Sequence, residues 1–494
     1  MLTIKKGSEK MKKLSVLSVL TALLAVLLLL SSCGVLTVNR PFEGEETTTD
    51  VADTKRPITE FESVRKEYNT ESESFMKDLS GNDYKGVAAK IVTSKKKLIL
   101  PEESIGTVLS KDLEERNSSV ESTLNISLIC EERDPDTMYK EIRACLATDT
   151  YYADAIMYPQ SLVGNFVVGG AVMNMRGLPS FETDQEYLYP TAVAAGTGGD
   201  AVYAVAGPAS LNPDALSALY FNKDIVTALG LESPYELVDR GEWTIDKYLE
   251  YLNAASAHES YHGYTSQNSN PYLTDLFFFS QGEHLTSSSL GSYPVVTLSS
   301  EKTAQVLAKI KESVALEKSA GGALTALNDF SEGNILFLID RLDSMKSLAN
   351  SKCDWGILPM PKFNTDQEKY ATLAYYDETL FFGALTTGAN YELTADLIAC
   401  INIMTYGYTN DAYCTNASYY YLRDNNSIRM LSTVLSNPVY DFAYSFAGTY
   451  NAIPSVSFMA VRNNVAGVST LERYLNMWTG QFNNAMYALF DTMN

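Results

Sequence analysis

The stretch Leu219–Leu252, LYFNKDIVTALGLESPYELVDRGEWTIDKYLEYL, decides how the middle of this sequence folds. Its start belongs to a strand-like run, SALYFNKDIV at 217–226. Its end opens TIDKYLEYLNAASA at 244–257, where apolar residues recur at helical spacing. Thr244 is placed to cap that helix by accepting a hydrogen bond from a free backbone N–H group. The stretch therefore predicts a strand followed by an amphipathic helix.

The same alternation extends outward from this stretch in both directions. Strands are predicted at 86–94, 125–130, 152–159, 201–208, 333–340 and 355–363. Helices are predicted at 110–124, 136–148, near 161–175, at 300–316 with Ser299 or Ser300 as cap, and at 392–407, ended by Gly407. Alternating strands and helices favour an α/β fold with a parallel sheet. A chain of 494 residues is long enough for two domains or lobes.

The charge balance narrows the classes of partner. The formal net charge is -22, and it is nearer -26 once the first 32 residues, which hold five Lys and one Glu, are removed. Such an acidic surface repels nucleic acid and anionic lipid head groups. We therefore expect no nucleic-acid partner.

The N-terminal segment 1–33 is typical of a secretory signal. A basic end with three lysines precedes an apolar run at 14–30, and Leu30-Ser31-Ser32-Cys33 follows it. This ending resembles a bacterial lipobox, in which Cys33 becomes the lipidated first residue. A plain signal peptide or an uncleaved anchor is the alternative, and either Met1 or Met11 can be the start.

The next segment, 34–82, carries Pro, Thr and acidic residues without apolar periodicity and is predicted to be a flexible tether. No later stretch is long and apolar enough to span a membrane. We expect the protein on the extracellular face of the bacterial cytoplasmic membrane, held by its lipid alone.

The remaining cysteines form no recognisable framework. They are odd in number and their spacings match no metal or disulfide scaffold, which favours buried free thiols: Cys130, Cys145, Cys353, Cys400 and Cys414. Pairing of Cys400 with Cys414 stays open.

The segment His258–His262 fits H-E-x-x-H, the pattern that binds zinc in peptidases when it lies inside a helix. Here the helix is predicted to end near Ala257–His258, and Gly263 and a polar loop follow at once. Asn268 stands where a longer form of the pattern needs a third His. Glu283, with His284 beside it, is the one downstream ligand at a tolerable spacing. We expect neither a metal nor a cofactor.

The aromatic composition is more telling than any catalytic signature. The chain has 32 Tyr against 19 Phe and 3 Trp. Tyrosine combines a flat apolar face with a polar tip, which suits stacking on sugar rings. The Gly-rich run at 196–201 leads into a strand instead of a helix, so a dinucleotide site is disfavoured. Most of the tyrosines serve the core and the surface of any secreted protein.

Several segments together resemble the family 1 extracellular solute-binding proteins, the lipoprotein receptors of ABC importers. The opening stretch, 219–252, resembles the family's strand, "YNKD" turn and following helix. The other similar segments, in matching order, are 112–128, 279–310, FSEGNILFLID at 330–340, WGILPMPKF at 355–363 and SNPVYDFAY at 436–444. Together they cover most of residues 83–494.

The resemblance implies an α/β, two-lobed periplasmic-binding-protein-like (type II) fold with hinge-crossing strands and a ligand cleft. The N-terminal lobe would hold 83–207 plus 377–415, and the C-terminal lobe 208–376 plus 416–494. Residues that follow strand ends or lie at a crossing would bind ligand, although loop or packing duty is equally open for each of them: Tyr158, Gln160, Tyr272, Asp275, Asp340, Arg341, Tyr376 and Asp377.

The function that the resemblance implies is capture of a small ligand, a carbohydrate or oligosaccharide, for ABC permease subunits by a monomeric receptor that is not an enzyme. Two alternatives stay open. One is a secreted hydrolase, either a zinc peptidase that uses His258 and His262 or a glycosidase. The other is a surface sensor with the same fold.

The lipobox generates the first prediction. Cys33→Ala removes the acceptor of the lipid and is expected to release the protein from membrane fractions. Partition of the variant and the wild type between aqueous and detergent phases measures this, and equal partition would refute lipidation.

Overall fold

The computed structural model describes residues 79, 81–101, 108–179, 181–266, 270–317, 323–406 and 409–491. The predicted signal segment, with Cys33, lies outside these residues. So does the predicted tether, apart from Leu79, Gly81 and Asn82. Within the described residues, no helix is both long enough and apolar enough to cross a membrane.

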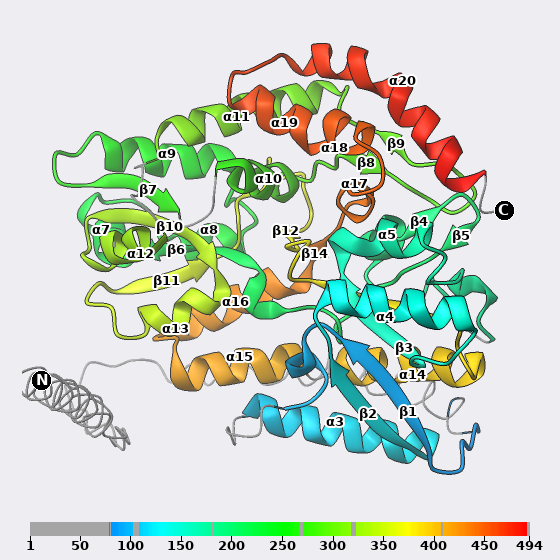
Figure 1. Ribbon diagram of the computed structural model, residues 1–494. Coiled ribbons are helices and arrows are strands. Elements are labelled where there is room, and N and C mark those ends of the chain that lie inside the picture. Colours follow the sequence, from blue (N-terminus) through cyan, green and yellow to red (C-terminus); the bar gives the residue numbers. More distant parts are fainter. Residues whose placement is uncertain are drawn as a thin grey trace, which may run out of the picture. The chain divides into compact units, whose positions relative to one another are not determined.

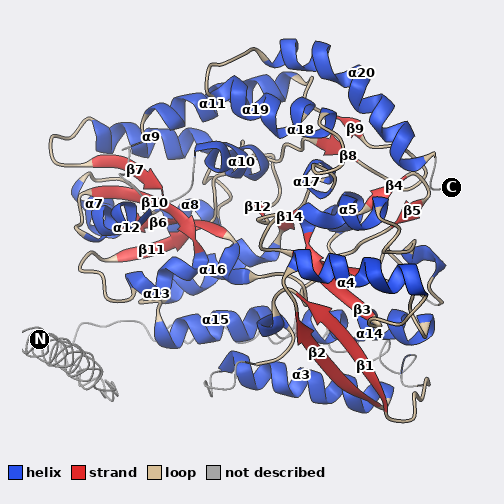
Figure 2. Cartoon of the chain, viewed as in Figure 1, coloured by secondary structure: helices blue, strands red, loops and turns tan. Residues whose placement is uncertain are grey.

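Two four-stranded sheets organise the described part of the chain (Figures 1 and 2). The first has the order β13 (Leu380–Ala384), β3 (Ala155–Pro159), β1 (Val87–Thr93) and β2 (Ile126–Glu132). The second has the order β11 (Trp355–Leu358), β6 (Ser217–Asn222), β10 (Ile335–Arg341) and β7 (His262–Ser266). We call the parts built on them the first-sheet lobe and the second-sheet lobe.

The predicted parallel sheet is correct only in part. Strands β1, β2 and β3 are parallel, as are β7 and β10. However, β13 runs antiparallel to β3, and β6 runs antiparallel to both of its neighbours. The parallel strands are joined by helical crossovers. Both sheets are therefore mixed.

Helices cover both sheets. Those that contact the first sheet include α3 (Val108–Leu124) and α14 (Tyr391–Tyr406). Those that contact the second include α7 (Lys223–Ala228), α8 (Pro234–Asp239), α9 (Ile245–Ser256), α12 (Ala323–Ser331) and α16 (Asn425–Ser436). The others are α4 (Pro135–Thr148), α5 (Val163–Val168), α6 (Pro190–Ala195), α10 (Asn270–Ser280), α11 (Glu301–Ala315), α13 (Met345–Leu348), α15 (Thr409–Tyr420), α17 (Phe442–Ser445), α18 (Ala452–Val456), α19 (Phe458–Val465) and α20 (Leu471–Phe490).

The residues that the structure describes also form three small two-stranded ladders: β12 (Thr372–Leu373) with β14 (Pro438–Val439), β4 (Thr197–Gly198) with β5 (Ala201–Val202), and β8 (Thr286–Ser287) with β9 (Val295–Val296). Of these, β12 and β14 pair in parallel. The 375–379 turn then leads from β12 to β13 of the first sheet.

The stretch 219–252 forms the predicted strand at its start and the predicted helix at its end. Between them it forms two short helices, α7 and α8, that the sequence did not predict. Thr244 caps α9 by accepting from the backbone N–H of Lys247. Strand β6 is shorter than predicted because Asn222 caps the unexpected helix α7, accepting from two backbone N–H groups of its first turn. Trp243 is fully buried and donates from its indole nitrogen to the Pro359 carbonyl at 3.1 Å. The stretch thereby joins α9 to the strand at the sheet edge.

Two other predicted elements are shorter than expected. The predicted strand at 201–208 is regular only over β5; beyond it Val205 makes an isolated bridge to Phe382, and Gly207 and Pro208 end the extended segment. The predicted helix at 161–175 ends with α5 at Val168 because Gly169 and Gly170 follow, the second with a φ of 65°.

The packing around β11 generates the second prediction. A methyl group on Gly356 would lie 1.9 Å from the Tyr235 hydroxyl oxygen, too close for any two nonbonded atoms. We expect Gly356→Ala to lower the free energy of unfolding by about 1–3 kcal/mol, the usual cost of overpacking a core. Gly480→Ala is the control, because open space surrounds Gly480 within α20, and it is expected to raise stability by about 0.5–1 kcal/mol. Equal urea midpoints for both variants would contradict this packing.

Candidate functional site

The 375–379 turn is where the two lobes meet. Its backbone accepts two hydrogen bonds from the end of β3, from Gln160 N–H to the Thr379 carbonyl at 3.0 Å and from Ser161 N–H to the Tyr376 carbonyl at 3.1 Å. On its other side the ring of Tyr375 meets the edge of Tyr272 from α10, with 4.7 Å between centroids. We call the turn and the side chains around it the junction site.

Glu378 fixes the charge of this turn. Its carboxylate lies 2.5 Å from the ammonium of Lys95, which follows β1, and 4.0 Å from the guanidinium of Arg341, the last residue of β10. All three side chains are between a fifth and two fifths exposed. Each pair contributes only modestly in this half-hydrated setting. One carboxylate is nevertheless shared by a cation from each sheet.

Aromatic rings form a row beside the turn. Tyr376 stacks on Tyr444 of α17, with centroids 4.6 Å apart and planes 10° apart. Tyr444 stacks in turn on Phe458 of α19, at 5.2 Å and 11°. The Tyr375 ring, which contacts Tyr272, lies 5.1 Å from the Tyr376 ring between centroids, so it links Tyr272 to the row. The rings come from four segments, of which only α17 and α19 are close in the sequence, and together they give the site a continuous aromatic wall.

A buried ion pair supports this wall. Asp275 of α10 is 1% exposed and accepts from Arg462 Nε at 3.1 and 3.0 Å, from Arg462 Nη2, and from the Tyr444 hydroxyl at 2.7 Å. The guanidinium also lies 4.6 Å from the centroid of the Phe458 ring. Burial raises the pKa of the Asp275 carboxyl, and Arg462 opposes that shift. The pair fixes α10, α17 and α19 together; Figure 1 shows α10 and α19 side by side.

Several buried polar atoms at the junction have no hydrogen-bond partner among the described residues. They are Gln160 Oε1, the Tyr272 hydroxyl, the Thr379 hydroxyl and Arg341 Nε. Buried polar atoms normally find partners, and leaving one without a partner costs free energy. Both donors and acceptors are present in this set, so it suits a ligand rich in hydroxyl groups.

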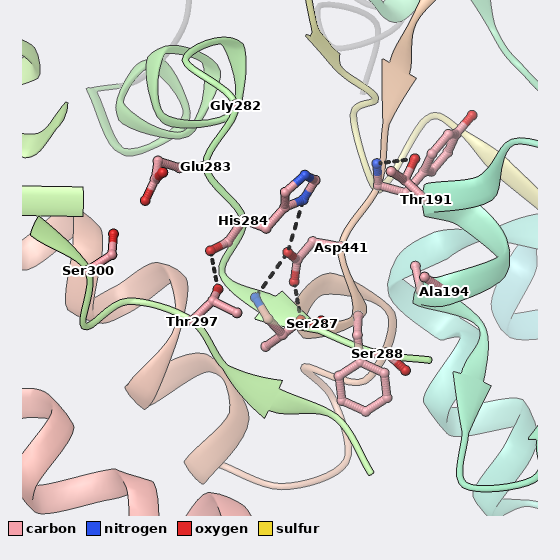
Figure 3. A pocket seen from close by; sticks show the side chains of 14 residues that line it. Thr191, Ala194, Gly282, Glu283, His284, Ser287, Ser288, Thr297, Ser300 and Asp441 are labelled. Atoms are coloured by element: carbon pink, nitrogen blue, oxygen red, sulfur yellow. Dashed lines mark hydrogen bonds and ion pairs between the residues drawn. The ribbon is translucent and has the colours of Figure 1, made fainter. Parts of the chain in front are cut away.

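A cavity of about 420 Å³ adjoins the junction site (Figure 3). Gln160 connects the two, because its amide nitrogen donates to the Asp441 carbonyl at 2.9 Å and to Ser445 Oγ at 3.1 Å. The lining comes from α6 on one side and from loops of the second-sheet lobe on the other, and it is rich in hydroxyl and charged groups: Thr191, Glu283, His284, Thr286, Ser287 and Asp441.

Asp441 organises the wall of this cavity. Its carboxylate accepts from the backbone N–H groups of Leu285 and Thr286 at 2.9 and 3.2 Å and from the Thr286 hydroxyl at 2.6 Å. Figure 3 shows the His284 ring and this carboxylate directed toward one another. His284 Nδ1 lies 4.0 Å from Asp441 Oδ2. Burial raises the pKa of Asp441, and His284 together with these hydrogen bonds opposes the shift.

Of the eight predicted ligand-binding residues, the structure brings Gln160, Tyr272, Arg341 and Tyr376 together at the turn. Asp275 lies directly behind the aromatic row.

The other three predicted residues lie elsewhere or make other contacts. Tyr158 is fully buried and stacks on Phe166 at 4.3 Å, so it presents no free ring face. Asp340 binds the backbone N–H of Arg341 and the Ser344 hydroxyl, and burial raises its pKa to about 6. Asp377 is exposed on the turn. Their roles in binding stay predictions.

Sequence reasoning missed several residues of the site: Tyr375, Asp441, Tyr444, Phe458 and Arg462. One signal for Arg462 was present, because it is the single cation in the largely apolar run FMAVRNNV at 458–465. No sequence pattern points to its partner, which lies 187 residues away.

The zinc pattern does not form in this fold. Helix α9 ends at Ser256, as predicted, so His258 lies beyond it and His262 opens β7. The two histidines therefore do not share a helical face. Among the described residues, no group of three or more His, Cys, Asp or Glu side chains is arranged to hold a metal ion.

Comparisons with known proteins give the fold. No protein-family model matches the chain, and no curated protein sequence matches it. A cyclo/maltodextrin-binding protein complexed with maltotetraose is similar at a TM-score of 0.50 and 13% identity, over 81% of this chain and 97% of the other. This likeness shows the predicted two-lobed periplasmic-binding-protein-like (type II) α/β fold.

Two other solved structures are similar at lower scores. One is the GacH receptor of Streptomyces glaucescens GLA.O, at a TM-score of 0.46 and 12% identity over 82% of this chain and 99% of that chain. The other is the ABC substrate-binding protein Lmo0181 from Listeria monocytogenes in complex with cycloalternan, at 0.47 and 13% over 81% of this chain and 99% of that chain.

The buried ion pair generates the third prediction. Arg462→Met leaves the Asp275 carboxylate buried without its counter-ion and is expected to lower the free energy of unfolding by about 3–5 kcal/mol at pH 8. Without the guanidinium, the native pKa of Asp275 rises further above its unfolded value. A raised native pKa favours folding at low pH and loses that effect as pH rises through it. The deficit of the variant should therefore shrink from pH 8 to pH 5.

Arg429→Met is the matched control. Arg429 lies 2.6 Å from Asp239, but both side chains are about two fifths exposed, so its removal is expected to cost less than about 1 kcal/mol. Denaturant unfolding at several pH values measures both variants. A deficit in Arg462→Met that matches the control, or that does not change with pH, would contradict the account of the pair.

Proposed function

We propose that the protein is a solute-binding receptor for a carbohydrate or oligosaccharide and is not an enzyme. One observation carries the proposal: a row of stacked aromatic rings lies beside buried polar atoms that have no hydrogen-bond partner in the described part of the chain, at the point where the two lobes meet. Sugar rings offer apolar faces that stack on aromatic side chains and hydroxyl groups that both donate and accept hydrogen bonds. The junction site provides a partner for each.

The neighbouring cavity supports an extended ligand. At about 420 Å³ it falls within the usual range for small-molecule sites, and hydroxyl, carboxylate and imidazole groups line it. A chain of sugar units seated at the junction could continue past Asp441 into this space. The solved protein of similar fold is described as a complex with maltotetraose, an oligosaccharide, which favours the same ligand class here.

The rest of the proposal follows from the sequence. Lipidation at Cys33 would hold the receptor on the extracellular face of the membrane, and ABC permease subunits would receive its ligand. The resemblance of most of residues 83–494 to family 1 extracellular solute-binding proteins supports membership of that family. Rotation of the two lobes about the crossings would release the sugar.

Removal of one aromatic ring from the junction generates the fourth prediction. A library of linear and cyclic oligosaccharides is first screened by thermal shift, because a ligand that binds only the folded state raises the melting temperature. Tyr272→Ala is expected to weaken binding of the selected sugar about 10- to 100-fold, from the loss of roughly 1–3 kcal/mol of ring burial.

A finer substitution separates binding from folding. Tyr272→Phe removes only a buried hydroxyl that makes no hydrogen bond within 3.5 Å to the described residues, so it should leave stability nearly unchanged and weaken sugar binding about fivefold, the effect of one hydrogen bond. Tyr248→Phe makes the same change in the core of the second-sheet lobe and should leave affinity unchanged. Wild-type affinity in both Tyr272 variants, measured by calorimetry, would rule out this site.

A further inference from the structure

A second cavity of about 420 Å³ lies apart from the junction site. It opens between α3 of the first-sheet lobe and α15. Its other walls come from α13 of the second-sheet lobe and from residues 208–214, which lead from β5 to β6 and which we call the crossing segment. None of the residues that line it lines the cavity of Figure 3. We call it the α3–α15 cavity.

The interior of the α3–α15 cavity is largely apolar. Leu113 of α3, Leu211 of the crossing segment and Met345 of α13 are each at most 5% exposed and contribute to its lining. The ring of Tyr413 from α15 adds an aromatic surface. Apolar side chains from four segments thus enclose a space large enough for a small molecule with a ring system.

Positive charge marks one side of this cavity. Lys97 and Lys346 lie 3.4 and 2.9 Å from the same carboxylate oxygen of Asp214, and the Tyr413 hydroxyl donates to the other oxygen at 2.8 Å. A second carboxylate, Asp343, also acts on both lysines, but it lies outside the lining and pairs with Arg341 at 3.5 Å. Among the described residues, the lining itself holds three cations, Lys97, Lys346 and Arg116, against the one carboxylate of Asp214, which leaves an excess positive charge. Both lysine side chains are more than two fifths exposed, so their ammonium groups can reach a further anionic partner.

A buried acceptor lies in the same lining. The side-chain oxygen of Asn416 is buried and has no hydrogen-bond partner among the described residues. Buried Arg116, which also lines the cavity, does not serve it, because its guanidinium donates to the Leu98 and Ile99 carbonyls, Thr405 and Asn117. An unpartnered buried acceptor requires an N–H or O–H donor from elsewhere.

We propose that the α3–α15 cavity binds a small amphiphilic anion: a molecule with an aromatic body, one negatively charged group and one N–H or O–H donor. The apolar walls take the ring system, Lys97 and Lys346 take the charge, and Asn416 accepts the donor. A ligand there contacts the crossing segment and both lobes at once, so it stabilises the arrangement in which these surfaces form one cavity.

The test uses two fluorescent probes that differ only in charge. 1-Anilinonaphthalene-8-sulfonate has the fused rings, the N–H group and a sulfonate, whereas N-phenyl-1-naphthylamine has the same rings and N–H group without the sulfonate. Titration of the full chain should give saturable binding of one sulfonate probe per chain. Its affinity in Lys97→Gln/Lys346→Gln should fall about five- to tenfold, the effect of two half-exposed ion pairs. The affinity of the neutral probe should not change.

The matched control is Lys140→Gln/Lys311→Gln, which removes the same charge from two exposed positions outside the cavity lining. It should leave the affinity ratio of the two probes as in the wild type. General loosening of the fold alters both probes together, so the ratio isolates the charge effect. An unchanged ratio in Lys97→Gln/Lys346→Gln, an equal fall in the control, or no saturable binding of the sulfonate probe would overturn the proposal.

Discussion

The short turn 375–379 is the constraint on which the described structure depends most. It must satisfy two backbone N–H groups at the end of β3, place Tyr375 against α10 and hold Glu378 between Lys95 and Arg341. Few positions of the turn meet all of these demands together. The ends of the central strands of both sheets are therefore fixed relative to one peptide segment, and the polar atoms near them have limited freedom to find other partners.

The ion pair behind the turn has a different role. The free energy lost when a carboxylate and a guanidinium leave water can exceed the free energy gained from their attraction. A buried pair is therefore weak evidence for a net gain in stability. Its geometry is specific: Asp275 accepts from Arg462 and from the Tyr444 hydroxyl, the Tyr444 ring stacks on Phe458, and the Arg462 guanidinium lies over the Phe458 ring. We interpret the pair as a device that orients the aromatic wall.

Local patterns predicted much of the fold and little of the site. Helix α9 with its Thr244 cap, helix α11 with Ser300 and the parallel strands β1 to β3 follow from periodicity and capping, which neighbouring residues determine. The antiparallel direction of β6 and β13 depends on their pairing with strands that lie far away in the sequence. Arg462 meets Asp275 across 187 residues, and no local pattern encodes that contact. Tyr158 is predicted to follow a strand end, but it lies within β3, and Phe166, only eight positions on, covers its ring.

The central claim is that a sugar bound at the junction holds the two lobes together. Small-angle X-ray scattering of the full chain, with and without a saturating oligosaccharide chosen by thermal shift, tests it most directly. If the ligand contacts both lobes, the radius of gyration should decrease when the sugar binds and stay unchanged with a sugar that gives no thermal shift. An unchanged scattering curve with a tightly bound sugar would contradict the account.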